Sequence, residues 1–203
     1  MYIPNSFNFD DRKEIISFMR RYSFATIINT KNELPIATQL PFSVAELDGK
    51  LFITSHFAKS NEQSVCIEDQ MSLIIFTEPH AYISPSHYDR RESVPTWDYI
   101  AVHAYGRAKI IRDEQRKINA LKDMIVFYEK DYLMQWNSLS DRFKLGMMNG
   151  IVAFEIEIEE LQAQKKLSQN KTAEERRRIA EHLEQSKNTS ERDIAKYIKS
   201  IKK

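Results

Sequence analysis

The chain has a single cysteine, Cys66, among its 203 residues. One thiol cannot form an intramolecular disulfide, and it cannot build a thiolate zinc site. The sequence also has no His-x-His or His-x-x-x-His pair that would suggest a different metal site. We therefore expect neither a disulfide nor a structural metal to stabilise the fold.

Long apolar runs are missing as well. No stretch approaches the roughly 20 apolar residues that a transmembrane helix needs. The N-terminal sequence MYIPNSFNFDDRKE has no basic region followed by an apolar core, as a signal peptide would have. We expect a cytoplasmic protein. No segment repeats, and with 42% hydrophobic residues the chain is long enough for one well-packed domain with an appendage.

Charge is unevenly distributed along the chain. Residues 165–203 hold 12 lysines and arginines against 6 acids, a net charge of +6, whereas residues 1–164 hold 18 against 23, a net charge of −5. We expect residues 1–164 to form the main domain and residues 165–203 to be a basic helical extension rather than an independent domain. Such an extension suits an anionic partner such as DNA, but a helix with a solvated charged face gives the same count.

Alternation of apolar and polar side chains predicts a mainly β or α+β fold. The stretches with this character are 24–30, 34–42, 50–55, 71–78, 80–85, 99–111 and 150–160. The short spacers KNEL and SVAELDG between the first three stretches are interpreted as hairpin turns. Helices are predicted outside this run, at 11–22, 113–132 and 139–148. The pattern favours an antiparallel β-barrel with peripheral helices over a doubly wound sheet.

Two helices are predicted in the basic extension. Thr172 and Glu175 form a capping box, which predicts a helix that runs to about Gln185. Ser190 with Asp193 predicts the start of a second helix. A DNA-binding helix-turn-helix is one interpretation of this pair. The favoured alternative is a helical hairpin that folds back onto the barrel or across a dimer, because a DNA reader usually keeps a third helix.

Polar side chains gather where the third predicted strand ends. The cluster consists of Thr54, Ser55, His56, Lys59 and Asn61. If a helix begins near residues 57–61, its free backbone N–H groups, the hydroxyls and the lysine suit a phosphate or a similar oxyanion. The alternative is that these residues only cap or turn the chain, which is common for His and Ser at strand ends.

Several motifs accompany this cluster: LPIATQLPF, SHFAKSNEQ, EPHAYISPSHY, VPTWDYIAVHAYGRA and KLSQN. With them the chain closely resembles the PaiB family, FMN-binding negative transcriptional regulators of bacteria, from MYIP to Asn170. The resemblance implies an antiparallel split barrel that forms a homodimer with FMN at the subunit interface. An FMN-dependent oxidoreductase or flavin reductase is the alternative function, because relatives with this fold include such enzymes. Haem is a further alternative cofactor, since some split-barrel proteins handle haem with histidine.

The resemblance also implies which residues contact the flavin. The cluster after the third strand would hold the phosphate, and Ala37, Thr38 and Gln39 would border the isoalloxazine ring. Trp97 has an alternative role as a plug at the barrel mouth or the dimer seam. The remaining implied lining residues, which a partner chain could supply, are Trp97, Tyr99, His103, Lys166, Ser168, Gln169 and Asn170.

The chain departs from the family pattern H-x-A-x-x-N-P-Q-W at two positions. Glu62 replaces the proline and Ser64 replaces the tryptophan. At about 6 Å and an effective dielectric constant of about 20, the Glu62 charge would oppose phosphate binding by about 3 kcal/mol. This penalty largely disappears if Glu62 points into solvent or lies in the first turn of a helix. A member that has lost its flavin would act only as an interaction module.

Overall fold

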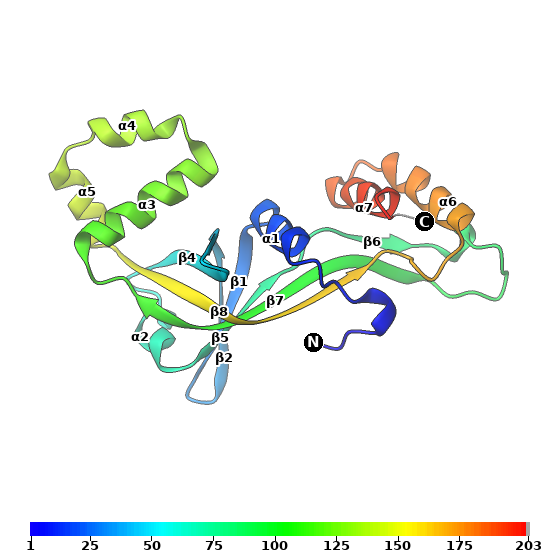
Figure 1. Ribbon diagram of the computed structural model, residues 1–203, viewed down its shortest axis with the longest axis horizontal. Coiled ribbons are helices and arrows are strands. Elements are labelled where there is room, and N and C mark those ends of the chain that lie inside the picture. The colour runs from blue at the N-terminus through cyan, green and yellow to red at the C-terminus, as the bar shows by residue number, and fades with distance from the viewer. Residues whose placement is uncertain (202–203) are drawn as a thin grey trace. The chain divides into compact units, whose positions relative to one another are not determined.

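The structure, a computed structural model, describes residues 1–201. Within them, eight strands form one antiparallel sheet in the order β2-β1-β5-β7-β8-β4-β3, and β6 pairs with β7 (Figure 1). The strands are β1 Phe24–Lys31, β2 Leu34–Pro41, β3 Ser43–Leu47, β4 Lys50–Ala58, β5 Met71–Phe76, β6 His80–Ile83, β7 Thr96–Ile110 and β8 Ile151–Lys166.

The described residues combine this sheet with helices, so the α+β class predicted from the sequence is confirmed. The α-helices in the described residues are α1 Arg12–Arg21, α2 Gln63–Cys66, α3 Glu114–Glu129, α4 Tyr132–Ser138, α5 Asp141–Met148, α6 Ala173–Glu184 and α7 Thr189–Lys199.

The chain divides into two compact units that share β7 and β8. We call residues 16–76 with 103–161 the core unit, and residues 1–15, 77–102 and 162 onward the tail unit. This division differs from the boundary after Gln164 suggested by charge, which stays a prediction about domain organisation.

Aromatic rings fill the interior of the core unit. Phe57 stacks on Phe154 with ring centroids 4.9 Å apart, and Phe42 meets Phe76 and Phe154 edge-on at 6.0 and 6.3 Å. All four rings are fully buried. Burial of one such ring contributes about 1.5–3 kcal/mol, so this group is a major source of stability.

A single glycine allows β7 to approach β8 closely. A Cβ added to Gly106 would lie 2.3 Å from the carbonyl oxygen of Glu157, a distance that no side chain tolerates. Only glycine fits at this point of the sheet.

Seven predicted strands are present, with ends that shift by a few residues. One prediction was wrong: SVAELDG is not only a turn but contains β3, which pairs with β4. Val44 is buried, and Asp48 and Gly49 form the tight turn with φ of 50° and 76°. Asp-Gly is the typical sequence of such a two-residue hairpin. The KNEL turn is confirmed, with positive φ at Asn32 and Glu33.

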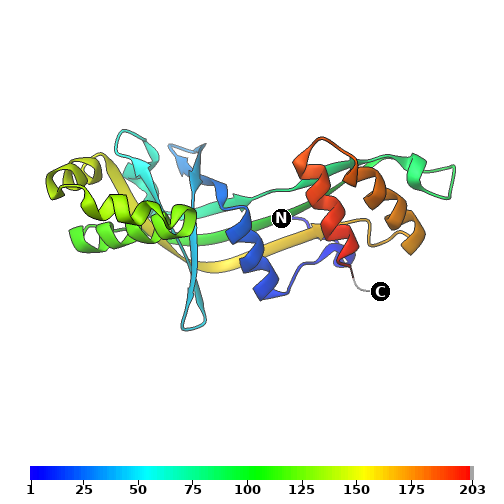
Figure 2. The same cartoon turned by 90° about the horizontal axis from the view of Figure 1, so that it is seen from above.

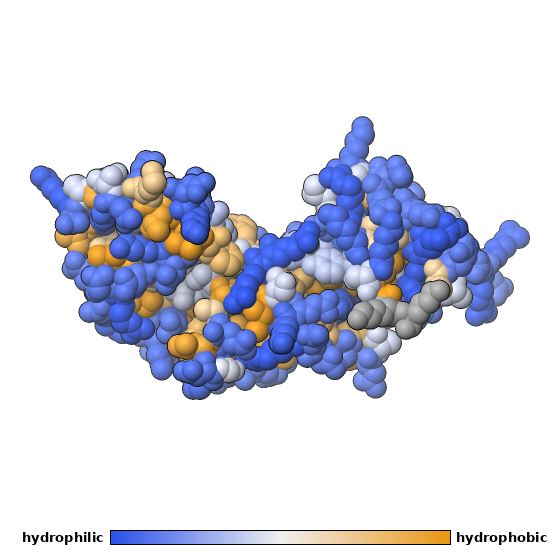
Figure 3. All heavy atoms as spheres, turned by 45° about the horizontal axis from the view of Figure 1, so that its top comes forward, coloured by the Kyte–Doolittle hydropathy of each residue, from blue (hydrophilic) through white to orange (hydrophobic). Residues whose placement is uncertain are grey.

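Helices α3 to α5 carry apolar side chains that remain in contact with solvent. Figure 3 shows hydrophobic residues gathered between polar ones over these helices. The separate helix α4 was not predicted from the sequence. The exposed large apolar residues are Val126, Tyr128, Met134, Phe143, Leu145 and Met147.

The tail unit contains the helical hairpin α6–α7, which packs against β6 (Figures 1 and 2). The capping box of Thr172 and Glu175 is confirmed. The predicted cap of the second helix was wrong, because Asn188 rather than Ser190 caps α7. Ser190 instead exchanges hydrogen bonds of 2.8 and 2.9 Å with the backbone of His80. The hairpin therefore folds onto the sheet, as the favoured interpretation predicts.

Candidate functional site

The polar cluster predicted after the third strand is divided between the two faces of β4. Ser55 points inward, is only 1% exposed, and donates a 2.7 Å hydrogen bond to the carbonyl of Pro41. Thr54 and His56 project from the opposite face, because side chains alternate along a strand. The structure thus separates Ser55 from the predicted phosphate cluster.

The turn after β4 is held by amide side chains. Asn61 Nδ2 donates to Thr38 Oγ1 at 2.9 Å, and Asn61 Oδ1 accepts from the backbone N–H of Gln63 at 2.9 Å. The Thr38 hydroxyl donates to Gln63 Oε1, and Gln63 Nε2 donates to Asn29 Oδ1 at 3.0 Å. Gln63 is only 1% exposed, so its side chain is the centre of this network. The side chains of Asn61 and Thr38 are therefore used mainly to hold the turn in shape.

A helix near residues 57–61, which the phosphate hypothesis assumed, is absent. Helix α2 begins at Gln63 and has four residues. The anion-binding capacity of this turn consequently depends on side chains rather than on a helix N-terminus.

Lys59 is the cation of this turn that is free to bind a ligand. Its backbone N–H donates to Gly150 O at 2.8 Å, which fixes the residue. Its side chain is exposed, and its ammonium group has no hydrogen bond or ion pair with residues 1–201. A lysine in this state can bind a phosphate as a point charge.

The two departures from the family pattern are accommodated locally. Glu62 forms an exposed 2.8 Å ion pair with Lys31, and this contact raises the pKa of Lys31. The charge of Glu62 is thus compensated by a neighbouring cation, which reduces its repulsion of a phosphate. Ser64 is buried and donates to Asn61 O at 2.7 Å, so it also belongs to the turn.

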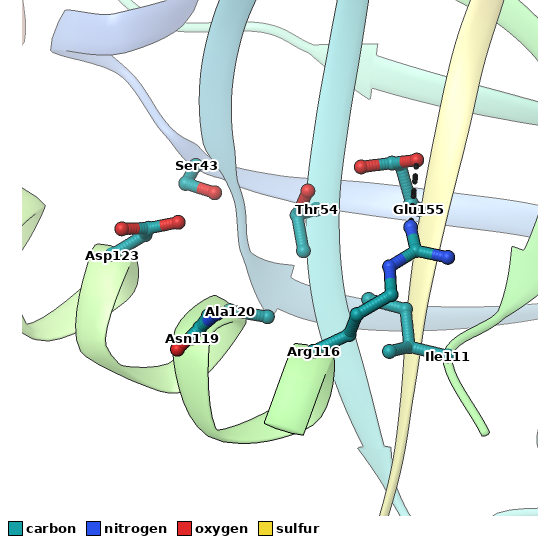
Figure 4. Close-up of a pocket in the computed structure, with 8 residues that line it drawn as sticks. All are labelled: Ser43, Thr54, Ile111, Arg116, Asn119, Ala120, Asp123 and Glu155. Atoms are coloured by element: carbon teal, nitrogen blue, oxygen red, sulfur yellow. Dashed lines mark ion pairs between the residues drawn. The ribbon is translucent and has the colours of Figure 1, made fainter. Parts of the chain in front are cut away.

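Two cavities lie between β4 and α3. The first has a volume of about 200 Å³ and is polar (Figure 4). Thr54 lies in it near Glu155, whose carboxylate is 3.7 Å from the guanidinium of Arg116. Its other lining residues are Ser43, Ile111, Asn119, Ala120 and Asp123.

The second cavity has a volume of about 320 Å³, which lies within the usual range for small-molecule sites. Its lining is mainly apolar and aromatic. It is bordered by His56, Leu121, Met124, Ile125, Tyr128, Glu129, Tyr132 and Trp136.

Two of these lining residues carry buried polar atoms without a partner. They are His56 Nδ1 and Trp136 Nε1, and Trp136 is only 7% exposed. Burial lowers the pKa of His56, so its imidazole is neutral at pH 7. Buried polar atoms normally have hydrogen-bond partners, and an unpaired one costs about 1–3 kcal/mol. Each of the two atoms therefore has an unused hydrogen-bonding position that a ligand could fill.

The remaining predicted residues of β2 and β7 are placed differently. Ala37 and Gln39 are exposed on β2. In the tail unit, the exposed Trp97 lies beside Tyr82, with ring centroids 5.8 Å apart. Tyr99 Oη donates to Gln164 at 3.2 Å. His103 belongs to the core unit, and its Nδ1 is buried without a partner.

The KLSQN segment mostly holds its own turn in the tail unit. Lys166 donates to the carbonyl of Trp97 at 2.6 Å, and burial lowers the pKa of this lysine. Gln169 folds back onto the backbone of its own turn, accepting from the N–H of Leu167 at 2.6 Å. Asn170 is exposed, so Asn170 and Trp97 are the predicted residues of this unit that remain open to a ligand.

Ser168 connects that turn to a buried carboxylate that the sequence reasoning missed. Ser168 Oγ donates to Asp98 Oδ2 at 2.7 Å. Asp98 is fully buried, and burial raises its pKa to about 6. Its other oxygen, Oδ1, has no partner among the described residues. The sequence signal for this buried carboxylate was an acidic residue inside the apolar run TWDYIAV.

The aromatic residues of the second cavity were also missed. Tyr128, Tyr132 and Trp136 lie on α3 and α4, where the sequence indicated only helix. A tryptophan and two tyrosines within nine positions, in a chain with two tryptophans, were the available signal.

Comparisons with known proteins bear directly on this site. The family described as "Putative FMN-binding domain" matches residues 1–160. The protease synthase and sporulation protein PAI 2 of Bacillus subtilis (strain 168) is 38% identical over 201 residues, which cover 98% of this chain and 96% of that protein. The chain belongs to the PaiB family. FMN is the cofactor of this PaiB-family domain, as the sequence predicts.

Solved structures confirm the split-barrel fold. A flavocytochrome from Azotobacter vinelandii superimposes with a TM-score of 0.61 at 15% identity, covering 77% of this chain and 67% of that one. An FAD- and heme-binding protein from Mycobacterium smegmatis gives a TM-score of 0.62 at 10% identity, covering 78% and 73%. At these identities the similarity concerns the fold of the PaiB-family chain.

Across residues 1–201, no helix combines the length and apolar character needed to cross a membrane. No group of three or more His, Cys, Asp or Glu side chains in the same part of the chain is arranged to bind a metal ion.

The residues of the core unit fit FMN. The second cavity supplies flat aromatic surface and the two unpaired polar atoms, which complement a ring that carries carbonyl oxygens and one N–H. Lys59 supplies the positive charge for a phosphate. It lies just past the end of β4, three positions after His56.

Proposed function

We propose that this PaiB-family chain is a homodimeric, cytoplasmic, FMN-binding regulator of transcription. The observation that carries the proposal is the aromatic cavity between β4 and α3 with its unpaired His56 Nδ1 and Trp136 Nε1. When bound, FMN supplies redox chemistry and a visible spectrum. The protein's own residues bind it, orient it and exclude water.

Each part of the flavin has a proposed partner. Trp136 and His56 would hydrogen-bond the edge of the ring, and the neutral state of His56 keeps one ring nitrogen available as an acceptor. Lys59 would bind the phosphate. Ala37, Gln39 and the lining residues of the tail unit stay candidates for further contacts, some of them from a partner chain.

A titration of purified protein with FMN tests this assignment. Lys59→Ala should weaken FMN binding roughly 10- to 100-fold, because a hydrogen bond to a charged group is worth about 1.5–3 kcal/mol. Lys50→Ala is the matched control, since it removes the same charge from the start of β4, where Lys50 pairs with Glu157 at 2.6 Å. Equal FMN affinity of both variants would remove Lys59 from the phosphate site.

The homodimer is supported by the exposed apolar side chains of α3 to α5. Exposed apolar patches on soluble domains commonly mark association surfaces. Light scattering on the full chain should give the mass of a dimer. The double variant Met134→Lys/Phe143→Lys should shift it toward a monomer, and an unchanged dimer would place the interface elsewhere.

The regulatory role is supported by membership of the PaiB family and competes with a flavin-dependent oxidoreductase or flavin reductase. Rapid mixing of the FMN-loaded protein with NADH or NADPH separates the two functions. A regulator predicts flavin that stays oxidised on the time scale of turnover, which for typical enzymes is about 0.001–1 s. Reduction at such a rate would favour the enzyme.

A further inference from the structure

A basic groove lies in the tail unit, between the loop after η3 (Pro85–His87) and Lys171, which precedes α6. It has a volume of about 650 Å³. Arg90 and Arg91 are exposed, and their guanidinium groups make no hydrogen bond or ion pair with the described residues. The lining residues are Arg90, Arg91, Glu92, Ser93, Val94 and Lys171.

The acids beside this groove are already occupied. The carboxylate of Asp89 pairs with Arg178 Nη2 at 2.6 Å. Glu175 accepts the backbone N–H groups of Asp89 at 3.0 Å and of Thr172 at 2.9 Å, and these bonds lower its pKa. Glu92 is therefore the acid among the lining residues, against three cations. The groove is left with net positive charge.

The groove is also held in shape. Arg178 Nε donates to His87 O at 2.9 Å, which fixes the start of the loop. Ser93 Oγ donates to Arg90 O at 2.8 Å, which closes the loop on itself. Lys171 lies with its ammonium nitrogen 3.7 Å from the centroid of the Tyr88 ring. The cations are thus presented by an ordered segment rather than by a loose tail.

The helices of the basic extension present much less free charge. On α6, Arg177 binds Glu174 and Glu181, each at 2.5 Å. On α7, Lys196 pairs with Asp193 at 2.7 Å, and Lys199 pairs with Glu184. The net charge of +6 counted these cations as available to an anionic partner, but each of them is already paired with an acid. Arg176 and Arg192 of these helices donate to backbone carbonyls, whereas Arg90 and Arg91, in the loop that α6 anchors, have no partner among the described residues.

We propose that the groove of Arg90, Arg91 and Lys171 binds the phosphate backbone of duplex DNA. The inference rests on the proposed regulatory function and assigns its DNA contact to this loop instead of to α6 and α7. Arginines bind phosphate oxygens in a bidentate manner. Contacts of this kind position a protein on DNA without reading its sequence.

Fluorescence anisotropy with a labelled duplex of about 20 base pairs of arbitrary sequence tests the groove. The full chain saturated with FMN is used throughout. Three phosphate contacts predict a slope of about −3 in a plot of log affinity against log salt for each groove that is engaged. Arg90→Ala/Arg91→Ala should reduce this slope by about 2 and weaken binding at low salt by tenfold or more.

A matched control separates the groove from a general effect of charge. Arg177→Ala/Lys199→Ala removes the same two charges, but from cations that are paired on α6 and α7. Binding should change by less than about threefold, because the charges of these cations are already compensated by Glu174, Glu181 and Glu184. If this control weakens binding as much as the arginine variant, the groove has no special role.

The other outcomes are equally decisive. If the arginine variant keeps the affinity and salt slope of the wild type, the DNA contact lies elsewhere, while a regulatory function survives. If the wild type binds no duplex at low salt but binds vesicles of anionic phospholipid, the groove serves a membrane surface and the DNA proposal is overturned. FMN affinity, measured in the same samples, reports separately on the flavin part of the proposed function.

Discussion

The turn after β4 and the turn after β8 use the same kinds of residue in different ways. Both contain a glutamine and a small polar residue that fold the chain back on itself. After β4, Gln63 and Asn61 are used in this way, and Lys59 is left free just past the end of the strand. After β8, the polar residues serve mainly to hold a buried carboxylate and their own backbone. Turns that contain the same kinds of residue therefore need not have the same role.

The largest effect on stability is expected at Gln63, the centre of the turn after β4. Gln63→Ala should lower the free energy of unfolding by about 2–4 kcal/mol, since it leaves Asn29 and Thr38 with broken buried hydrogen bonds. Urea denaturation measures this value. Gln39→Ala removes the same side chain from an exposed position of β2 and should change stability by less than about 0.5 kcal/mol. Similar losses in the two variants would mean that Gln63 does not organise the turn.

The turn after β8 should make the stability of the protein depend on pH through Asp98. Its pKa of about 6 in the folded chain lies above the unfolded value, so the folded state binds the proton more strongly. The contribution of Asp98 to stability is therefore least favourable above pH 6 and improves as the pH falls toward 4. Asp98→Asn should be more stable than the wild type at pH 7 by on the order of 2 kcal/mol, with the difference shrinking toward pH 4.

Urea denaturation of both proteins between pH 4 and pH 7.5, the window set by the two pKa values, measures that difference. Asn keeps an oxygen that can accept the hydrogen bond of Ser168, so the variant isolates the charge. A difference that does not depend on pH would contradict a buried, weakly acidic Asp98.

A smaller effect concerns the ion pair beside Lys59. Lys31→Ala should weaken FMN binding by roughly two- to fivefold, because it leaves the Glu62 charge uncompensated near the phosphate. Lys31→Ala/Glu62→Gln should restore the affinity. A double variant that binds FMN as weakly as the single one would show that Glu62 does not act on the flavin.

The smallest effect is expected at Asn170. This residue is exposed, and its side chain has no hydrogen bond within residues 1–201. Asn170→Ala should therefore change stability by less than about 0.5 kcal/mol, in contrast to Ser168→Ala, which removes the donor to Asp98 and should cost about 1–3 kcal/mol at pH 7. Equal losses would contradict the distinction between residues that hold the turn and residues open to a ligand.

Much of the fold could be predicted because its signals are local. Alternation in the strands, the Thr172 capping box and the family motifs each act over a few residues. β3 was missed because a five-residue strand joined by Asp48 and Gly49 reads as part of a turn. The inward direction of Ser55 follows from strand alternation, but the favoured phosphate cluster obscured it.

The aromatic cavity could not be predicted in the same way. It needs His56 of β4 and Trp136 of α4 to be brought together by packing, and no sequence spacing encodes that contact. The same holds for the pairing of Arg178 with Asp89, which leaves Arg90 and Arg91 as unpaired cations. Sequence counts give the number of charges, whereas the structure decides which of them are free.

The central claim is that the flavin ring occupies the cavity beside Trp136. The two tryptophans of the chain give two indole N–H signals in a ¹H–¹⁵N NMR spectrum, and Trp97→Phe assigns them. On addition of FMN, the Trp136 signal is expected to shift. Stoichiometric FMN binding that leaves the Trp136 signal unchanged would contradict this placement of the flavin ring.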